Sequence, residues 1–417
     1  MFNHWMTKSL LGLAMALALL TPASAQTDQT KPAPHTLIVV SIDGYRADYI
    51  KRGLSPHLEA LKARGVYAHA MRPSYPTVTA PNHYTLMTGL YPDHHGVIDN
   101  NMVDPKLPGI EFGRPSFAYD NDPRWWDAAT PLWVSAVKSG MIVAASAWPG
   151  QASRIHNITP NYLQTWQYNL KPAVQSQMVL SWLSLPQADR PRLILLHYLA
   201  VDEMGHAYGP DTPQVNAAIS DVSAALGELF DGLKQHGLMD STNLVVVSDH
   251  GMSATSAKRT IWLDDLFNVQ DAIVPSYGAF AGITPKPGHT ADIEKALLKP
   301  NAHMTCWKKA DIPARLHFGS NPRVPAIWCE AKDGWLIMTH AIDNAYYKKH
   351  PINGEHGYDP SDPKMAALFV AAGPDFKSGV VVPDFPNIDI YPMLARLLGI
   401  TPLAHDGDDT LVHAALK

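Results

Sequence analysis

The 417-residue chain contains little charge and no excess of basic residues. Charged residues make up 17% of it, and 38 acidic residues against 33 basic ones give a formal net charge of −5. A protein that tracks the phosphates of a polynucleotide needs a basic surface, so we expect no specific nucleic-acid binding. Hydrophobic residues make up 46% of the chain, which is ample for a globular core.

The chain also lacks an apolar stretch long enough to span a membrane. The apolar residues 10–20 fall short of the roughly 20 that a helical span requires. They follow Lys8 and precede Ala-Ser-Ala at residues 23–25, the pattern of a cleaved signal peptide. We therefore expect residues 1–25 to be a signal peptide of bacterial type and residues 26–34 a disordered leader. The mature protein is then secreted or periplasmic.

Cysteine is scarce as well. An exported chain can join its two cysteines, Cys306 and Cys329, in one disulfide, and two buried thiols are the alternative. Both lie in a stretch after His250 that several prolines interrupt. We expect roughly residues 265–350 to form an inserted subdomain that the disulfide stiffens.

Three apolar runs are typical of buried parallel strands, and each ends in residues that can bind a metal. They are residues 36–42 with Asp43, residues 193–201 with Asp202, and residues 243–248 with Asp249 and His250. Ligands in open α/β sheets bind at the carboxyl ends of the strands. Asp202 and His206 are four residues apart, so one turn of helix would place both side chains on one face.

Helix signals alternate with these strands. Hydroxyl–proline pairs at Ser55-Pro56, Thr130-Pro131 and Thr212-Pro213 predict helix starts, and glycines at 65, 140 and 237 predict the ends. Residues 141–147 and 365–371 read as further buried strands. Because the alternation runs from residue 36 to 400 without a linker, we expect one α/β domain over residues 35–417. Its sheet should be doubly wound and mostly parallel, with helices on both faces.

Residues 77–89 read as a strand end that turns into a helix at Thr79. Pro81 suits a first helical turn, whose N–H groups and positive dipole end attract an anion. Thr79 would face a phosphate, although the same pattern also serves a plain helix cap. His356, in a glycine-flanked loop, is a further candidate ligand. Each Asp and His has a bland explanation as a cap or turn residue, but together they match two zinc ions, which take N and O ligands.

These segments together resemble the nucleotide pyrophosphatase/phosphodiesterase family of the alkaline phosphatase superfamily. The motifs are Ser41-Ile42-Asp43-Gly44, Thr79-Ala80-Pro81-Asn82-His83-Tyr84, Val201-Asp202-x-x-Gly205-His206, Ser248-Asp249-His250-Gly251-Met252 and His356-Gly357-Tyr358. They occur in the family's order and span residues 37 to about 400. The resemblance implies an alkaline-phosphatase-like fold and two Zn²⁺ ions. One would be held by Asp202, His206 and His356, and the other by Asp43, Asp249 and His250 with Thr79.

The resemblance also implies the chemistry. Coordination to zinc lowers the pKa of a hydroxyl, so Thr79 can attack phosphorus without a separate base. Asn100 would donate a hydrogen bond to a non-bridging phosphate oxygen. A phosphothreonine would form and then be hydrolysed by water, releasing a phosphomonoester such as a nucleoside monophosphate. The expected partner is therefore a small phosphodiester, with a nucleotide as the first candidate.

Two positions depart from the family pattern. Members that act on nucleotides typically carry an aromatic residue directly after the nucleophile and a tyrosine five residues before the Asp of the Asp-x-x-x-His pair. This chain has Ala80 and His197 there. Base stacking is worth roughly 1–3 kcal/mol, and alanine cannot supply it. The substrate pocket lined by Ala80 and His197 could therefore take a nucleotide in a repacked form, or a lipid head-group or sugar diester.

Two other functions remain as alternatives. A phosphomonoesterase on the same fold would need an arginine or a third-metal cluster to hold the dianionic phosphate, and the sequence offers no obvious candidate for either. A binding protein that keeps the metals without turnover would have no need of the Thr79 hydroxyl.

Overall fold

In the computed structural model of the protein, the described residues are 35–113, 121–167, 170–342 and 351–417. The expected signal peptide and leader (residues 1–34) lie outside them, as do residues 343–350 at the end of the expected subdomain. The described residues form one compact unit. Among the described residues, no helix is both long and apolar enough to cross a membrane.

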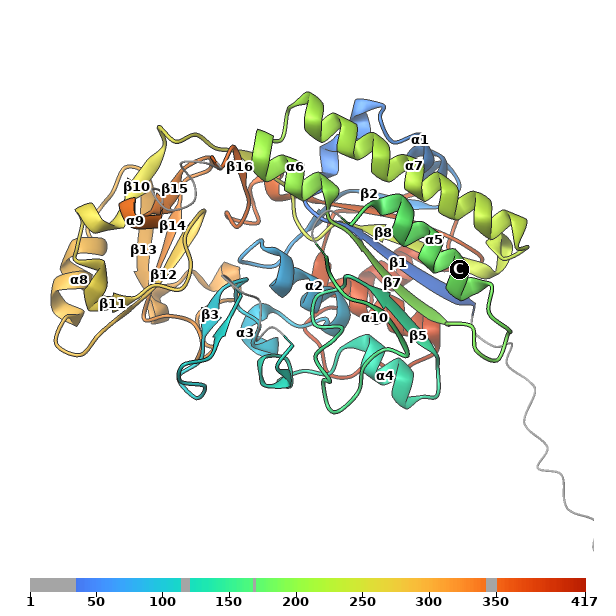
Figure 1. The fold of residues 1–417 in the computed structure, drawn as a ribbon, viewed down its shortest axis with the longest axis horizontal. Helices are drawn as coiled ribbons and strands as arrows, with labels where there is room; N and C mark the ends of the chain where they lie inside the picture. Colours follow the sequence, from blue (N-terminus) through green and yellow to red (C-terminus); the bar gives the residue numbers. More distant parts are fainter. Residues whose placement is uncertain (1–34, 114–120, 168–169, 343–350) are drawn as a thin grey trace, which may run out of the picture. The chain divides into compact units, whose positions relative to one another are not determined.

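The main sheet is built around three parallel strands that are almost wholly buried (Figure 1). These are β1 (Thr36–Ile42), β7 (Leu193–Tyr198) and β8 (Thr242–Val247), and β1 lies between the other two. Their apolar runs face helices on both sides, which explains why they do not alternate with polar residues. Because β7 and β8 both run parallel to β1, the residues that follow the three strands meet at one edge.

The complete strand order is β18-β2-β17-β8-β1-β7-β5-β6, with β19 beside β2. The outer strands are β2 (Val66–Arg72), β5 (Val143–Ser146), β6 (Tyr162–Gln164), β17 (Ala367–Ala372), β18 (Val380–Val382) and β19 (Phe385–Pro386). Only β17 runs antiparallel to its neighbours among these described pairings. The expectation of a mostly parallel sheet is confirmed.

Helices cover both faces of this sheet, so it has two cores. Val39 packs into the core that includes residues of α2 (Thr79–Thr88), α4 (Leu132–Lys138) and α10 (Ile390–Leu398). Val40, the next residue of β1, packs into the opposite core. That core includes residues of α1 (Pro56–Ala63), α5 (Pro172–Leu183), α6 (Ala200–Tyr208) and α7 (Pro213–Gln235). Three shorter helices, α3 (Pro92–His95), α9 (His340–Ile342) and α11 (Thr410–Ala415), lie between strands or at the end of the chain.

The expected helix starts are correct to within one residue. Thr212 caps α7, with its hydroxyl accepting the Val215 N–H. Ser55 precedes α1, but its hydroxyl pairs with the Tyr45 hydroxyl instead of the helix. Thr130 is not the cap of α4, because Pro131 occupies that place and the Thr130 hydroxyl lies 3.0 Å from a ring nitrogen of His156.

A separate antiparallel sheet lies within the range expected for the subdomain. Its order is β11-β12-β14-β13, with bounds β11 (Ala272–Ile273), β12 (Phe280–Pro285), β13 (Met304–Lys308) and β14 (Ile327–Ala331). Cys306 and Cys329 are directly opposite each other on β13 and β14 and form a disulfide. Nearby elements are α8 (Thr290–Leu297) and the pair β10 (Thr260–Trp262) and β15 (Leu336–Met338). Two further antiparallel pairs are β3 (Met102–Val103) with β4 (Glu111–Phe112), and β9 (Ser253–Ala254) with β16 (Gly354–Glu355).

Candidate metal and phosphate site

The carboxyl edge of the three central strands carries most of the expected ligands. Asp43 follows β1, and Asp249 and His250 follow β8. Asp202 and His206 lie on α6, which begins two residues after β7 ends. Gly44 has a φ of 64°, and a Cβ there would lie 3.0 Å from Asp202 Oδ1. Glycine is therefore needed for the loop after β1 to approach the start of α6.

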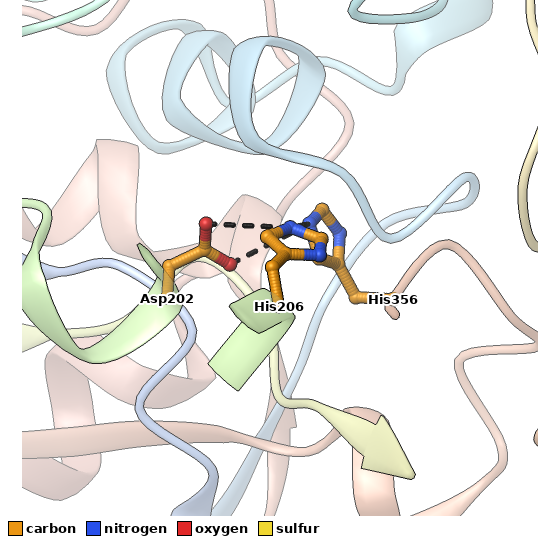
Figure 2. Close-up of side chains that lie close together, drawn as sticks. All are labelled: Asp202, His206 and His356. Atoms are coloured by element: carbon orange, nitrogen blue, oxygen red, sulfur yellow. Dashed lines mark hydrogen bonds and ion pairs between the residues drawn. The ribbon is translucent and has the colours of Figure 1, made fainter. Parts of the chain in front are cut away.

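The first expected ligand set, Asp202, His206 and His356, comes together (Figure 2). The two imidazole Nε2 atoms are 3.1 Å apart. Asp202 Oδ2 lies 3.4 Å from the Nε2 of His206, and Oδ1 lies 3.6 Å from that of His356. Spacings of this size between nitrogen and oxygen atoms fit one cation among the three side chains.

The second expected set adjoins the first. Asp43 Oδ1 lies 3.4 Å from His250 Nε2, and Asp249 Oδ2 lies 3.0 Å from the same nitrogen. Asp202 also comes within ligand spacing of Asp43 and His250, which places it between the two sets. The rings of His250 and His356 stack with centroids 3.6 Å apart. The site is therefore one continuous cluster made of two adjoining sets of candidate metal ligands.

Backbone carbonyls orient all three imidazoles. The Nδ1 atoms of His206, His250 and His356 lie 2.9, 3.0 and 2.9 Å from backbone carbonyl oxygens of residues 354, 251 and 77. A carbonyl only accepts, so each Nδ1 carries the hydrogen and each Nε2 presents a lone pair to the site. This is the arrangement that metal-ligating histidines adopt.

Three carboxylate oxygens of the cluster are buried without a hydrogen-bond partner among the described residues. They are Asp43 Oδ1, Asp202 Oδ1 and Asp249 Oδ2. In contrast, Asp249 Oδ1 accepts the backbone N–H groups of Gly44 and His250. A buried carboxylate oxygen without a partner is costly, and a divalent cation removes that cost. The residues present thus fit metal ions with N and O ligands, as zinc has.

The charged groups of the cluster interact strongly. Burial acts to lower the pKa of His250, but Asp249 outweighs it and raises that pKa, so a metal ion must displace a proton there. Burial, followed by the charges of Asp249 and Asp202, raises the pKa of Asp43 well above its ordinary value. Burial also acts to raise the pKa of Asp249, but His250 and His83 outweigh it and hold that pKa below its usual value. Burial, with His250 and His206 nearby, lowers the pKa of His356. The carboxylates crowd each other, and His356 is neutral as a metal ligand must be.

Thr79 is the first residue of α2, so the helix begins where the sequence predicts, but no strand leads directly into it because β2 ends at Arg72. Thr79 Oγ1 lies 3.2 Å from His250 Nε2, inside the second ligand set. The Ala80 N–H donates to Asn100 Oδ1 at 2.7 Å. Because that contact takes the carbonyl oxygen of the Asn100 side chain, its NH₂ group is left to face other partners.

The structure corrects the expected role of His197 in the substrate pocket. The side chain is only 1% exposed, so neither face of its ring is open to a base. It lies on β7 beside Ser41 of β1, and its Nε2 is 3.0 Å from Asp43 Oδ2. Ala80 is 9% exposed and belongs to the core around α2.

Sequence reasoning assigned no role to His83, which also supports the site. Its Nδ1 donates to the Thr79 carbonyl at 2.9 Å and lies 3.5 Å from Asp249 Oδ2. Burial lowers its pKa to about 3, so the ring is neutral. Its position four residues after Thr79, one turn along the same helix, was the sequence feature that could have indicated this role.

The fold and the cluster point to a class of enzymes that bind metal ions at the carboxyl edge of a mostly parallel sheet. Comparison with known proteins narrows the class. The family model described as type I phosphodiesterase / nucleotide pyrophosphatase matches residues 37–359. The chain belongs to this family.

Relatives of the chain include an uncharacterised pyrophosphatase/phosphodiesterase of Schizosaccharomyces pombe. It is 36% identical over 382 residues, covering 89% of this chain and 78% of the relative. Human ectonucleotide pyrophosphatase/phosphodiesterase family member 5 is 33% identical, covering 94% of this chain and 79% of its own length. A solved structure of the murine member 5, an inactive threonine-to-alanine variant in complex with AMP, superposes with a TM-score of 0.86. It is 32% identical and covers 92% of this chain and 100% of the murine one.

Proposed function

We propose that the protein is an exported two-zinc phosphodiesterase that cleaves phosphodiester or pyrophosphate bonds through a phosphothreonine at Thr79. The observation that carries this proposal is the position of the Thr79 hydroxyl. It lies 3.2 Å from His250 Nε2, among carboxylate oxygens that have no partner in the described part of the chain. A hydroxyl placed there serves a reaction, because a helix cap needs no contact with a ligand cluster.

Zinc, when bound, would lower the pKa of the Thr79 hydroxyl and offset negative charge on the phosphate. The Thr79 hydroxyl gives up its proton to solvent and its oxygen attacks phosphorus in line. The bond from phosphorus to the leaving oxygen breaks, and the leaving oxygen takes a proton from solvent. Asn100 donates to a non-bridging oxygen through its NH₂ group. Water then attacks the phosphothreonine, which returns the Thr79 hydroxyl and releases a phosphomonoester.

We infer that the substrate is a small nucleotide, because a murine relative is known in complex with AMP. A lipid head-group or sugar diester is the alternative, since Ala80 offers no ring to a base. A phosphomonoesterase is disfavoured. Among the described residues, the side chains that contact Asp43, Asp249 and His356 in the cluster are histidines and a carboxylate. A dianionic phosphate is better served by an arginine or lysine.

Export is part of the proposal. The relatives named above include ectonucleotide enzymes, and the disulfide between Cys306 and Cys329 suits an oxidising compartment. The amino-terminal pattern of residues 1–25 would supply the signal peptide, with release into the periplasm or medium.

The decisive test is Thr79→Ala, assayed on a nitrophenyl phosphodiester and on the matching monoester. We expect the variant to lose at least a thousandfold in kcat on the diester, because the attacking atom is gone. Zinc content and melting temperature should stay near wild type, since six other side chains hold the ions. Thr79→Ser is the matched control and should keep part of the rate. Diester hydrolysis by Thr79→Ala at the wild-type rate would show that water attacks directly, and a wild-type preference for the monoester would favour a phosphatase.

A further inference from the structure

His197 is held by hydrogen bonds at both ring nitrogens. Its Nδ1 lies 3.1 Å from the Ala147 carbonyl oxygen, and its Nε2 lies 3.0 Å from Asp43 Oδ2. The carbonyl only accepts, so Nδ1 carries a hydrogen and the ring is fixed in one orientation. A neutral histidine carries only one ring hydrogen, so Nε2 can also donate to an ionised Asp43 only when the ring is a cation. Burial opposes that charge by lowering the pKa of His197, and the nearby carboxylates favour it. The ring therefore connects the backbone of one strand end to a candidate metal ligand on another.

The backbone that holds His197 is itself unusual. Ala147 is buried and has a φ of 56°, in the left-handed region that favours glycine. This conformation presents its carbonyl oxygen to His197. The Gln175 side chain donates to the His197 carbonyl and to the Ser146 hydroxyl, which fixes β5 and β7 beside each other. Strained residues persist where the surroundings require them, and here the strain serves the position of His197.

The two carboxylate oxygens of Asp43 therefore have different surroundings. His197 occupies Oδ2, while Oδ1 has no hydrogen-bond partner among the described residues and lies 3.4 Å from His250 Nε2. The carboxylate is thus turned so that a single oxygen faces the second ligand set. Outer partners of this kind orient metal ligands and tune their basicity.

We propose that His197 is a positioning residue that orients Asp43 toward the second metal ion. Family members that act on nucleotides typically have a tyrosine at this position, whereas this chain has a buried histidine. The inference rests on the proposed two-zinc function and adds to it a residue that acts through Asp43 without touching the substrate.

The test compares His197→Asn with His197→Gln. The asparagine amide reaches about as far as Nδ1, so it can keep the bond to the Ala147 carbonyl but cannot reach Asp43. The glutamine amide reaches about as far as Nε2 and can donate to Asp43. Metal-stripped proteins are titrated with zinc against a chromogenic chelator, and bound zinc is counted by elemental analysis. We expect the asparagine variant to bind one of its two zinc ions 10–100-fold more weakly and the glutamine variant to bind both nearly as wild type does.

A kinetic readout accompanies the titration. At saturating substrate and limiting zinc, kcat of His197→Asn should fall with the occupancy of the weakened site, while KM on a nitrophenyl diester stays near wild type. Tyr198→Phe is the matched control. It lies next to His197 on β7 but belongs to the opposite core, and it loses a buried 2.6 Å hydrogen bond to Ser176. The control should lower thermal stability without changing either zinc affinity.

Wild-type affinity for both zinc ions in His197→Asn would overturn the inference. So would equal losses in the asparagine and glutamine variants, because the ring's bulk would then matter and its hydrogen bond would not. If the asparagine variant does not fold, the glutamine variant decides: retention of both zinc ions supports the role of the donor, and loss of one overturns it. Wild-type protein that binds fewer than two zinc ions would instead overturn the proposed function and this inference with it.

Discussion

At the scale of single residues, backbone carbonyls decide which side chains can bind a metal. In each of the three candidate histidine ligands, Nδ1 donates to a backbone carbonyl and Nε2 faces the site. Both ring nitrogens of His197 contact protein groups, so neither is available to a metal ion. The residue therefore orients the candidate ligand Asp43 and is not itself a ligand. Residue type alone does not separate these two uses of histidine, because the difference lies in what faces the second nitrogen.

Ala80→Phe tests whether the missing aromatic residue changes the substrate preference. Ala80 is 9% exposed and follows Thr79 directly, so a phenylalanine ring at that position can reach the substrate only through the small open part of its surface. We expect KM for a nitrophenyl ester of thymidine monophosphate to fall about tenfold, within the 1–3 kcal/mol range of base stacking. KM for a base-free nitrophenyl diester should not change.

The base-free substrate serves as the control for Ala80→Phe. If the variant gains nothing and the wild type already prefers nucleotide diesters strongly, other residues supply the stacking surface, and Ala80 does not alter specificity. A loss of melting temperature with no change in KM would show that the ring packs into the core around α2.

At the scale of elements, the disulfide joins two neighbouring strands of the second sheet. Cys306 and Cys329 are separated by 23 residues and lie opposite each other on β13 and β14. Closing a loop of this length contributes about 3 kcal/mol in the chain-entropy model. We expect the double variant Cys306→Ala/Cys329→Ala to lose stability of that order in denaturant titration while keeping most of its kcat, since neither cysteine contacts the ligand cluster.

Reduction provides the control for the disulfide prediction. Dithiothreitol should lower the melting temperature of the wild type and leave that of the double variant unchanged. Two titratable thiols in the denatured, unreduced wild-type protein would contradict the prediction.

Glu330 on β14 gives the second sheet a predictable pH dependence. Burial raises its pKa from 4.5 to about 8, Asp359 adds to the effect, and Arg315 and the Tyr75 hydroxyl oppose it. The folded protein keeps this proton between about pH 4.5 and pH 8, where the unfolded chain has released it. Stability from this group is therefore fully present below pH 4.5 and is lost as the pH rises to about 8.

Glu330→Gln should remove that loss, because the amide stays neutral at every pH. We expect the variant to gain free energy of unfolding over the wild type as the pH rises from 5 to 8, by an amount on the order of a few kcal/mol at about 1.4 kcal/mol per pKa unit. Urea titrations at fixed zinc concentration measure it. Glu228→Gln on α7 is the control for the same charge change at an exposed site, and equal pH profiles for the two variants would contradict the prediction.

At the scale of the whole molecule, the site depends on segments far apart in the chain meeting over one sheet. Candidate ligand residues come from positions 43, 202, 206, 249, 250 and 356. Without cations, the carboxylates of this cluster repel one another in a buried place. Metal binding should therefore stabilise the folded state as a whole.

Removal of zinc tests this dependence. Elemental analysis of the mature protein should return two zinc ions per chain, and chelation should abolish activity and lower the melting temperature. At a free zinc concentration 100 times the dissociation constant, each site adds about 2.7 kcal/mol to the free energy of unfolding. Readdition of zinc should restore both properties, with magnesium as the control ion. A chelated protein that melts at the same temperature as the loaded one would contradict the coupling of metal to fold.

Local patterns in the sequence were enough to predict much of this architecture. Uninterrupted apolar runs predict β1, β7 and β8, the Thr212-Pro213 pair predicts the start of α7, and the spacing of Asp202 and His206 predicts one helical face. With only two cysteines in the chain, a disulfide could have only one pairing. Motifs in a fixed order were enough to identify the family.

Only the tertiary structure decided how those parts act on one another. The sequence shows that Asp43 and His197 each lie in or after a strand, but their contact follows from β1 and β7 being neighbours in register. The left-handed Ala147, the lack of exposure of His197 and the raised pKa of Glu330 have no local signal either. Strand formation depends on a few adjacent residues, whereas burial, strain and charge coupling depend on groups that are distant in sequence and are brought together only when the sheet and its helices pack.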